Sequence, residues 1–305
     1  MTTILLLGKT GQVGHELLRS LAPLGTLIAP GRVELDLANP DSIRSVILDA
    51  RPDVIVNAAG VTVVDAAEAQ PELAMKINGT APGIIAEAAK SIGALLVHYS
   101  TTFVFEGTKH DPYTESDTPN PINAYGRSKL VGEQAVQACG GDHIILRANW
   151  TYSSRRINFA LSLLELARSQ TEVRVVDDQI GAPTWARIYA DTTAMMLKNQ
   201  PQLREKSGVY NLSANGRCTR FQWAELIVES AKVLTGSRHG WASLTRTTTK
   251  DYVNPAPRPL HTITNNNKIR DLLGVELTSW DTGIKDFMQD HFHKRFADTG
   301  ASHGN

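Results

Sequence analysis

Short apolar runs alternate with helical patterns along the first half of the chain. The runs stand at residues 3–7, 27–29, 54–57, 94–99 and 143–147. Their length, and the glycine or proline that follows the first two, predict buried β-strands. Helical patterns lie between them at residues 15–21, 40–50, 71–91 and 125–139, the third of which is interrupted by Gly79 and Pro82. Strands that alternate with helices predict an α/β fold with a doubly wound parallel sheet.

The alternation is less regular after residue 152, which predicts a second and smaller domain. Helical patterns occupy residues 156–168, 185–197, 221–234, 265–273 and 280–291, and apolar runs at 173–176 and 209–212 predict strands. We expect a first domain at 1–152 and a second domain mainly from 153–296, with some later elements returning to the sheet. Residues 297–305 are small and polar, and we expect a frayed tail there.

Three glycines follow the first strand and precede the first helix. Gly8, Gly11 and Gly14 form a G-x-x-G-x-x-G pattern, one residue wider than the common dinucleotide fingerprint. Glycines let the backbone approach a pyrophosphate, and a helix N-terminus offers free N–H groups. The turn is not a P-loop, because no Gly-Lys-Ser/Thr follows a first glycine after four intervening residues. Because the turn follows the first strand, we favour a Rossmann-type dinucleotide site over a turn without a ligand.

The segment after the second strand bears on the choice of dinucleotide. Sites that select NAD usually carry an acid there for the ribose hydroxyl, whereas Arg32 in this chain suits a 2′-phosphate. Lys9 in the glycine turn could assist Arg32, and Glu34 is the competing acid. We therefore predict NADPH as the cofactor, with NADH as the alternative. Arg32 could also be an ordinary exposed charge in a loop, with no role in binding.

Small and polar residues follow two further strands. Ala58 and Ala59 come after the third strand, where they either leave room for a flat ligand or pack against a helix. Thr101 follows the fourth strand, where its hydroxyl could donate to a substrate carbonyl or simply end the strand. His98 lies inside that strand, and we expect a core histidine.

Tyr125 and Lys129 form the most informative pair. They are i and i+4 at the start of one helix, with Cβ atoms ~6 Å apart. A phenol has a pKa of about 10, and an adjacent ammonium lowers it toward the range useful for proton transfer. The pair is useful only if it is desolvated and a second positive charge, such as an oxidised nicotinamide, lies close. A tyrosine and a lysine on a solvated helix face are otherwise commonplace.

Composition excludes several classes of function. The 305 residues are 42% hydrophobic and 20% charged, with 31 basic and 31 acidic residues. A net charge of zero does not suggest binding to nucleic acid or to a membrane surface. The apolar runs are too short to span a bilayer, and the N-terminus does not resemble a signal peptide. Cys139 and Cys218 match no metal spacing, and we expect a cytoplasmic protein.

Together these motifs resemble the extended short-chain dehydrogenase/reductases, and within them the reductases of nucleotide-activated 4-keto-deoxysugars. The resemblance extends to about residue 273, with further matches at residues 34–37, 51–59, 64–65, 100–101, 149–150, 178–184 and 258–259. It implies a Rossmann-type sheet domain and a smaller substrate-binding domain. It also implies NADPH-dependent reduction of the 4-keto group of a nucleotide sugar, dTDP-4-dehydro-L-rhamnose to dTDP-L-rhamnose, and it allows a homodimer.

The resemblance also assigns roles by position. Tyr125 would donate the proton, Lys129 would hold the nicotinamide ribose, and Thr101 would bind the keto oxygen. The other cofactor residues would be Gly8, Gly11, Gln12, Val13, Asp36, Leu37, Ala58, Ala59 and Thr62, together with Arg32. The sugar pocket would be lined by Val64, Thr102, Phe103 and Trp150, with Asn158 and Arg258 as weaker candidates at the nucleotide phosphates.

The chain departs from the family pattern beside the sugar. The family usually has Asp-Tyr where this chain has Thr102-Phe103, so a charged acceptor and a hydroxyl are missing. This leaves the hydride chemistry unchanged and the identity of the sugar open. Acidic C-terminal residues that bind a metal in some relatives are not recognisable, and no metal is predicted. The rival readings are an NAD-dependent nucleotide-sugar epimerase or dehydratase and a non-catalytic regulatory subunit of the same fold.

Overall fold

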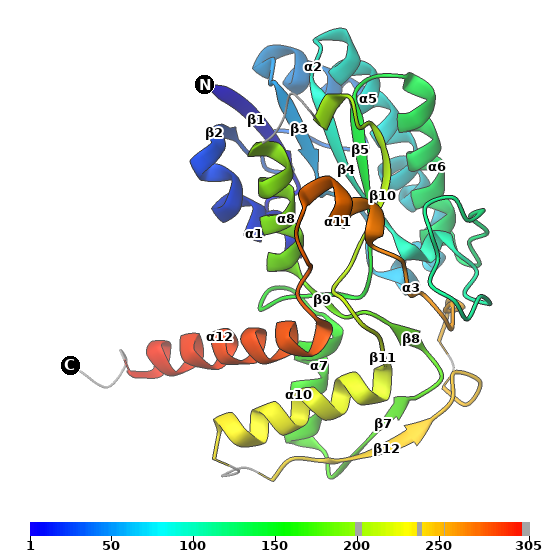
Figure 1. Ribbon diagram of the computed structural model, residues 1–305, viewed down its shortest axis with the longest axis vertical. Helices are drawn as coiled ribbons and strands as arrows, with labels where there is room; N and C mark the ends of the chain where they lie inside the picture. Colours follow the sequence, from blue (N-terminus) through cyan, green and yellow to red (C-terminus); the bar gives the residue numbers. More distant parts are fainter. Residues whose placement is uncertain (199–202, 237–239, 253, 301–305) are drawn as a thin grey trace.

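The structure is a computed structural model that describes residues 1–198, 203–236, 240–252 and 254–300. A sheet flanked by helices forms the larger part of the molecule, and a smaller group of helices and short strands lies at one end of it (Figure 1). The α/β fold predicted from the alternation of strands and helices is confirmed.

The central sheet has six strands, and all neighbouring strands are parallel. In spatial order they are β10 (Gly208–Leu212), β5 (His143–Ala148), β4 (Leu95–Thr101), β3 (Val54–Asn57), β1 (Thr2–Leu7) and β2 (Gly25–Ile28). The chain runs from β1 to one edge and then returns to build the other side from β3 onward. Such a reversal leaves a crevice beyond the carboxyl ends of the strands, where open α/β sheets bind ligands.

Helices cover both faces of this sheet, because the buried strand residues alternate between the two faces. Ile4 and Leu6 share one core with α1 (Gln12–Leu21), α8 (Ala186–Lys198) and α11 (Asn267–Leu273). Leu5 and Leu7 share the opposite core with α2 (Pro40–Ala50), α5 (Ala81–Ser91) and α6 (Ala124–Cys139). Figure 1 shows α1 and α8 on one side of the sheet and α5 and α6 on the other.

The helical stretch with two interruptions is continuous in the structure. After α3 (Val64–Ala69), α4 (Pro71–Ala74) leads into a π-helical turn at Met75–Thr80 and then into α5. Pro82 directly follows the π-helical turn, and this local widening of the helix is where the ring of a proline and its missing N–H are accommodated. The π-turn places Asn78 in the interior, where it is 1% exposed. Such turns often occur at functional sites.

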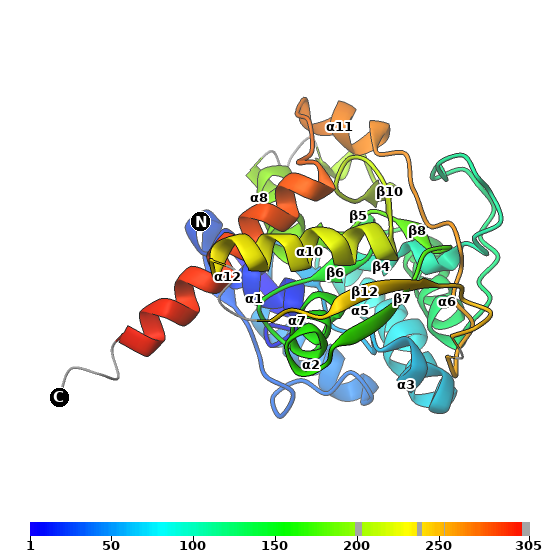
Figure 2. The same cartoon turned by 90° about the horizontal axis from the view of Figure 1, so that it is seen from below.

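The smaller group has its own aromatic core around Trp223, Tyr152 and Phe287. Its elements are β6 (Thr151–Tyr152), α7 (Phe159–Ser169), β7 (Glu172–Val176), β8 (Ile180–Gly181), β9 (Thr184–Trp185), β11 (Cys218–Thr219), α10 (Arg220–Leu234), β12 (Ser243–Thr247) and α12 (Trp280–Gly300). Seen from below, α10 and α12 lie across the end of the sheet domain (Figure 2).

Three later elements belong to the sheet domain, namely α8, β10 and α11. Residues 153–296 are therefore divided between the two groups. At the C-terminus, helix α12 continues to Gly300, and the rest of the expected tail, residues 301–305, lies outside the described residues. Among the residues that the structure describes, no helix combines the length and the hydropathy needed to cross a bilayer.

Candidate active site

A cavity of about 650 Å³ lies at the carboxyl ends of β1, β3, β4 and β5. Its size is within the range of small-molecule sites, ~300–1,000 Å³. The sheet domain supplies most of its lining, and residues 150–157 and Arg220 close the remaining side. Every predicted cofactor residue and every predicted catalytic residue lines it. The structure therefore gathers motifs that lie more than a hundred positions apart in the sequence.

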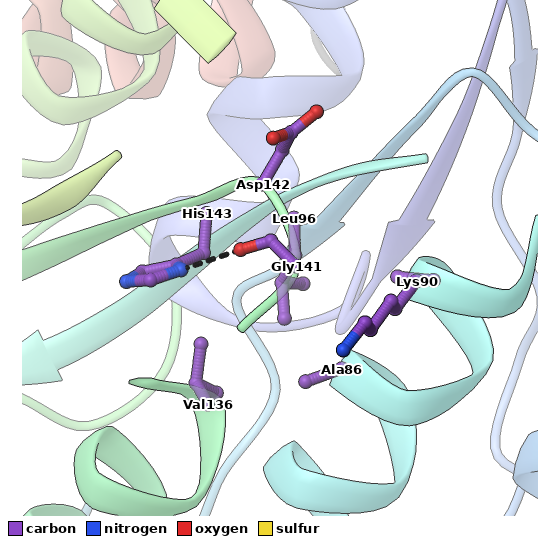
Figure 3. Close-up of a pocket in the computed structure, with 8 residues that line it drawn as sticks. Ala86, Lys90, Leu96, Val136, Gly141, Asp142 and His143 are labelled. Carbon is purple, nitrogen blue, oxygen red and sulfur yellow. Dashed lines mark hydrogen bonds between the residues drawn. The ribbon is translucent and has the colours of Figure 1, made fainter. Parts of the chain in front are cut away.

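A second hollow lies at the opposite, amino end of β5. It is bounded by α5, α6 and the start of the strand, with His143 Nδ1 2.8 Å from the Gly141 carbonyl oxygen (Figure 3). Its volume of about 10 Å³ is roughly that of one water. It has no room for a substrate, and we assign it no function.

The glycine turn forms one end of the cavity. The Gly11 N–H donates to the Gly8 carbonyl oxygen at 2.9 Å, and Gly8 has a φ of 91°. A Cβ on Gly14 would lie 2.0 Å from the Gly8 oxygen, and one on Gly8 would lie 2.7 Å from the Ala59 nitrogen. The turn thus brings bare backbone and the start of α1 to the cavity, which fits a dinucleotide pyrophosphate.

The next part of the cavity is the one predicted to hold the adenosine of the cofactor. Arg32 lines it, and the carboxylate of Glu34 is engaged in a hydrogen bond. Arg32, Asp36 and Leu37 line the cavity, whereas the Glu34 carboxylate accepts a hydrogen bond from the Gly31 N–H at 2.5 Å. Lys9 also lines the cavity, and its ammonium donates to the Ala29 carbonyl oxygen at 2.6 Å. These contacts occupy the acid that would favour NADH and leave Arg32 beside the cavity.

The middle of the cavity is formed by the turn after β3. Ala58, Ala59 and Thr62 line it, so both alanines face a ligand space, which was one of the two readings of this turn. Asn78 fixes the turn, because its side chain accepts from the Val61 N–H and donates to the Val61 carbonyl oxygen, each at 2.9 Å. Asn78 also donates to Ser128 Oγ on α6 at 3.1 Å. This residue was missed in the sequence, where only the interrupted helix pattern marked it.

Tyr125 and Lys129 lie on the buried face of α6, which begins at the capping residue Asn123. The Asn123 side chain accepts from the Gly126 N–H at 2.8 Å and starts the helix directly before Tyr125. Tyr125 is 9% exposed, Lys129 is 4% exposed, and both line the cavity. Thr101 Oγ1 accepts from the Phe103 N–H at 3.1 Å, which leaves its own proton free to donate to Tyr125.

The predicted lowering of the Tyr125 pKa by Lys129 required a nearby nicotinamide, and it stays a prediction for the enzyme with its cofactor bound. Burial raises the pKa of Tyr125, and the hydrogen bond from Thr101 acts in the opposite direction. The Lys129 ammonium instead donates to the Tyr99 carbonyl oxygen and lies 3.5 Å from His98 Nε2. A raised pKa keeps the phenol protonated at neutral pH, as a proton donor requires.

The pKa of Lys129 is also shifted from its ordinary value. Burial lowers its pKa to about 8, while the charge of Glu133 acts in the opposite direction. His98 is fully buried inside β4, as expected of a core histidine, and burial together with Lys129 lowers its pKa. A neutral His98 leaves Lys129 as the cation at this end of the cavity.

This perturbation predicts a stability that depends on pH. The unfolded chain has a lysine pKa of about 10.4, so between that value and about 8 it binds more protons than the native state. Folding is therefore favoured as the pH rises through this window. Relative to Lys129→Met, the free energy of unfolding should rise by about 2 kcal/mol between about pH 7.5 and about pH 9.5, measured by urea denaturation. A difference that falls over this range would contradict the assignment.

The predicted sugar end is only partly as expected. Val64, Phe103 and Trp150 line the cavity, with the Phe103 and Tyr125 ring centroids 6.0 Å apart. Thr102 does not line it, which corrects its prediction as a substrate residue. Thr101 is the last residue of β4, whereas Thr102 begins a 3-10 turn at Thr102–Val104 whose three residues are buried. Thr102 is fully buried, and its Oγ1 has no hydrogen-bond partner among the described residues.

The two weaker candidates for the nucleotide phosphates have other contacts. Asn158 caps α7 by accepting from the N–H groups of Ala160 and Leu161. Arg258 pairs with Asp65 at 2.8 Å. Neither lines the cavity, but Arg220, which we had not singled out, does. No group of three or more histidine, cysteine or acidic side chains is placed to hold a metal within the described ranges.

Comparison with known proteins agrees with this geometry. The sequence model of the family described as RmlD substrate binding domain matches residues 1–292. A dTDP-4-dehydrorhamnose reductase of Burkholderia thailandensis is 43% identical over 282 residues, which cover 91% of this chain and 95% of that protein. The enzyme of the same name from Escherichia coli K12 is 40% identical over 293 residues, covering 95% and 98%.

The chain belongs to the RmlD family of dTDP-4-dehydrorhamnose reductases. Solved structures of the family include the Bacillus anthracis reductase in complex with NADP, with a TM-score of 0.86, 30% identity and coverage of 95% of this chain and 99% of that one. The UDP-glucose 4-epimerase of Thermotoga maritima has a TM-score of 0.78 at 18% identity, covering 96% and 99%, and shares the fold alone. The family resemblance inferred from the motifs is thus confirmed.

Proposed function

We propose that this chain reduces the 4-keto group of dTDP-4-dehydro-L-rhamnose to the hydroxyl of dTDP-L-rhamnose, using NADPH. The observation that supports it most directly is the buried Tyr125, bonded to Thr101, in the cavity that begins at the glycine turn. Identity of 40–43% to enzymes of that name gives independent support.

NADPH would supply a hydride to the carbonyl carbon and leave as NADP⁺. Tyr125 would transfer its phenolic proton to the carbonyl oxygen, which balances the reduction of the C=O bond to an alcohol. The single hydroxyl proton of Thr101 would be donated to Tyr125 as the phenolate forms, rather than to the keto oxygen as the resemblance implies. Lys129 would hold the nicotinamide ribose while stabilising that negative charge. The glycine turn, Gln12, Val13, Ala58, Ala59 and Thr62 would hold the rest of the cofactor.

The two-domain division takes its functional meaning from this proposal. The sheet domain, residues 1–152 with the later elements α8, β10 and α11, would bind the cofactor. The remainder of residues 153–296 would bind the nucleotide sugar. We further propose a cytoplasmic location, for which the free thiols of Cys139 and Cys218 are the support. A homodimer, which light scattering would detect, completes the proposal, and no nucleic acid takes part in it.

The decisive measurement is oxidation of NADPH, followed by absorbance, with dTDP- and GDP-linked 4-keto-deoxysugars. We expect turnover with the dTDP sugar and no NAD⁺ retained after gel filtration. Retained NAD⁺ with interconversion of sugar epimers would support an epimerase instead. Absence of NADPH oxidation with every keto sugar would revive the regulatory-subunit reading.

Arg32 provides the test of cofactor choice. Arg32→Ala should raise the KM for NADPH by about tenfold or more, because a charge-assisted contact contributes roughly 1.5–3 kcal/mol. The KM for NADH should stay the same, since NADH lacks the 2′-phosphate. Equal changes for both cofactors would contradict the role of Arg32, and Arg44→Ala on the outer surface of α2 is the matched control.

A further inference from the structure

Arg220 places a positive charge in the part of the cavity wall that the smaller domain supplies. It is the first residue of α10 and lines the cavity together with Trp150 and Phe103. Its guanidinium carbon lies 3.8 Å from the centroid of the Trp150 ring, and the rings of Phe159 and Trp223 are 5.0 Å and 5.2 Å away. Three aromatic rings therefore hold the guanidinium at the cavity wall.

Arg220 lacks a negatively charged partner among the described residues. Among the described residues it forms no ion pair, and burial lowers its pKa to about 9. The neighbouring Arg258 acts in the same direction, although Arg258 itself has Asp65 as a partner at 2.8 Å. Arg220 is half-buried at the wall of the cavity, and a guanidinium beside another cation is stabilised there by a bound anion. No carboxylate among the described residues forms an ion pair with Arg220, so an anionic ligand in the cavity is the partner that fits it.

Two features define the anion. The guanidinium is planar and bidentate, which suits phosphate oxygens, and the start of α10 adds the positive end of a helix dipole. The glycine turn is the proposed site of the cofactor pyrophosphate, so Arg220 on the smaller domain is available to a second anion. Arg156 does not compete with Arg220, because it donates to the Thr10 carbonyl oxygen at 3.0 Å and so lies on the glycine turn.

We propose that Arg220 binds the diphosphate of the nucleotide-sugar substrate and thereby positions the sugar between Trp150 and Tyr125. This rests on the proposed function for the identity of the sugar, but the binding of a nucleoside diphosphate can be measured without turnover. Arg220 replaces Arg258 as the phosphate ligand, because Arg258 is paired with Asp65 and lies outside the cavity lining.

The test compares Arg220→Met and Arg220→Lys with the native enzyme by calorimetry, using dTDP, UDP, GDP, thymidine and NADPH as probes. Arg220→Met should weaken dTDP binding by about 10- to 100-fold and leave the affinities for thymidine and NADPH unchanged. Arg220→Lys should fall between, because an ammonium cannot form the bidentate contact. In turnover assays the KM for the keto sugar should rise by a similar factor.

Arg217→Met is the matched control, since Arg217 is exposed three residues earlier and does not line the cavity. It should bind dTDP as the native enzyme does. The inference is overturned if Arg220→Met binds dTDP with native affinity, if its NADPH affinity falls equally, or if the native enzyme binds none of the three nucleoside diphosphates. If the native enzyme binds dTDP through Arg220 but reduces no keto sugar, the proposed function fails and the inference stands.

Discussion

Tyr125→Phe is expected to lower kcat for reduction of the keto sugar by about 10²- to 10⁴-fold, the usual share of general acid catalysis. The substitution removes the phenolic proton and keeps the ring. The edge contact with Phe103, at 6.0 Å between centroids, is therefore retained. The lost hydrogen bond is the one from Thr101. Because the native pKa is raised, the native rate should stay constant across neutral pH and fall only in alkaline solution.

Single-turnover oxidation of NADPH measures this loss without interference from product release. Tyr210→Phe is the control, since the Tyr210 hydroxyl donates to the Lys206 carbonyl oxygen at 2.7 Å and Tyr210 lies outside the cavity lining. The KM for NADPH and the urea midpoint of Tyr125→Phe should match the native values. Normal turnover in the variant would mean that another group or a water protonates the sugar oxygen.

The parts of the site that are local in sequence were predictable. A helical spacing of four places Tyr125 and Lys129 on one face, and the carboxyl ends of parallel strands meet at one edge. The glycine turn, Ala58, Ala59 and Thr101 therefore had to approach one another once the strands were recognised. The same reasoning located the sheet and its crevice.

The parts that depend on pairing across the fold were not predictable. In the protein alone, burial raises the pKa of Tyr125 and the hydrogen bond from Thr101 partly opposes it, and the spacing of Tyr125 and Lys129 determines neither effect. Arg258 was a candidate phosphate ligand until the structure paired it with Asp65, and Arg220, which the sequence analysis did not single out, lines the cavity instead. Thr102 occupies the position of a substrate residue in the family motif, but its side chain is buried and does not line the cavity.

The buried ion pair of Glu133 and Arg147 illustrates how much of a contact between distant elements the sequence indicates. Glu133 stands four residues after Lys129 on the same helix face, and Arg147 ends an apolar run that predicts a buried strand. A charge in a buried strand needs a partner, because an unpaired buried charge is strongly destabilising. The partner itself came from another element, fourteen residues earlier in the sequence.

Replacing Arg147 with methionine is expected to lower the free energy of unfolding by about 3–5 kcal/mol. Glu133 is 1% exposed and Arg147 is 3% exposed, and three hydrogen bonds of 2.7–3.2 Å join them. Ser100 Oγ donates to the same carboxylate at 2.5 Å. Without the guanidinium, Glu133 would remain buried with one hydroxyl as its partner, so most of the cost comes from the stranded carboxylate. Urea unfolding followed by tryptophan fluorescence measures it.

The double variant Arg147→Met/Glu133→Leu separates this cost from the loss of the attraction itself. A buried ion pair is often no more stabilising than apolar residues of similar volume, so the double variant should recover most of the loss. It should also lower the pKa of Lys129 further, because the charge of Glu133 opposes the effect of burial on that lysine. A single variant that costs under about 1 kcal/mol, or a double variant that is less stable than the single one, would show that the carboxylate finds other partners.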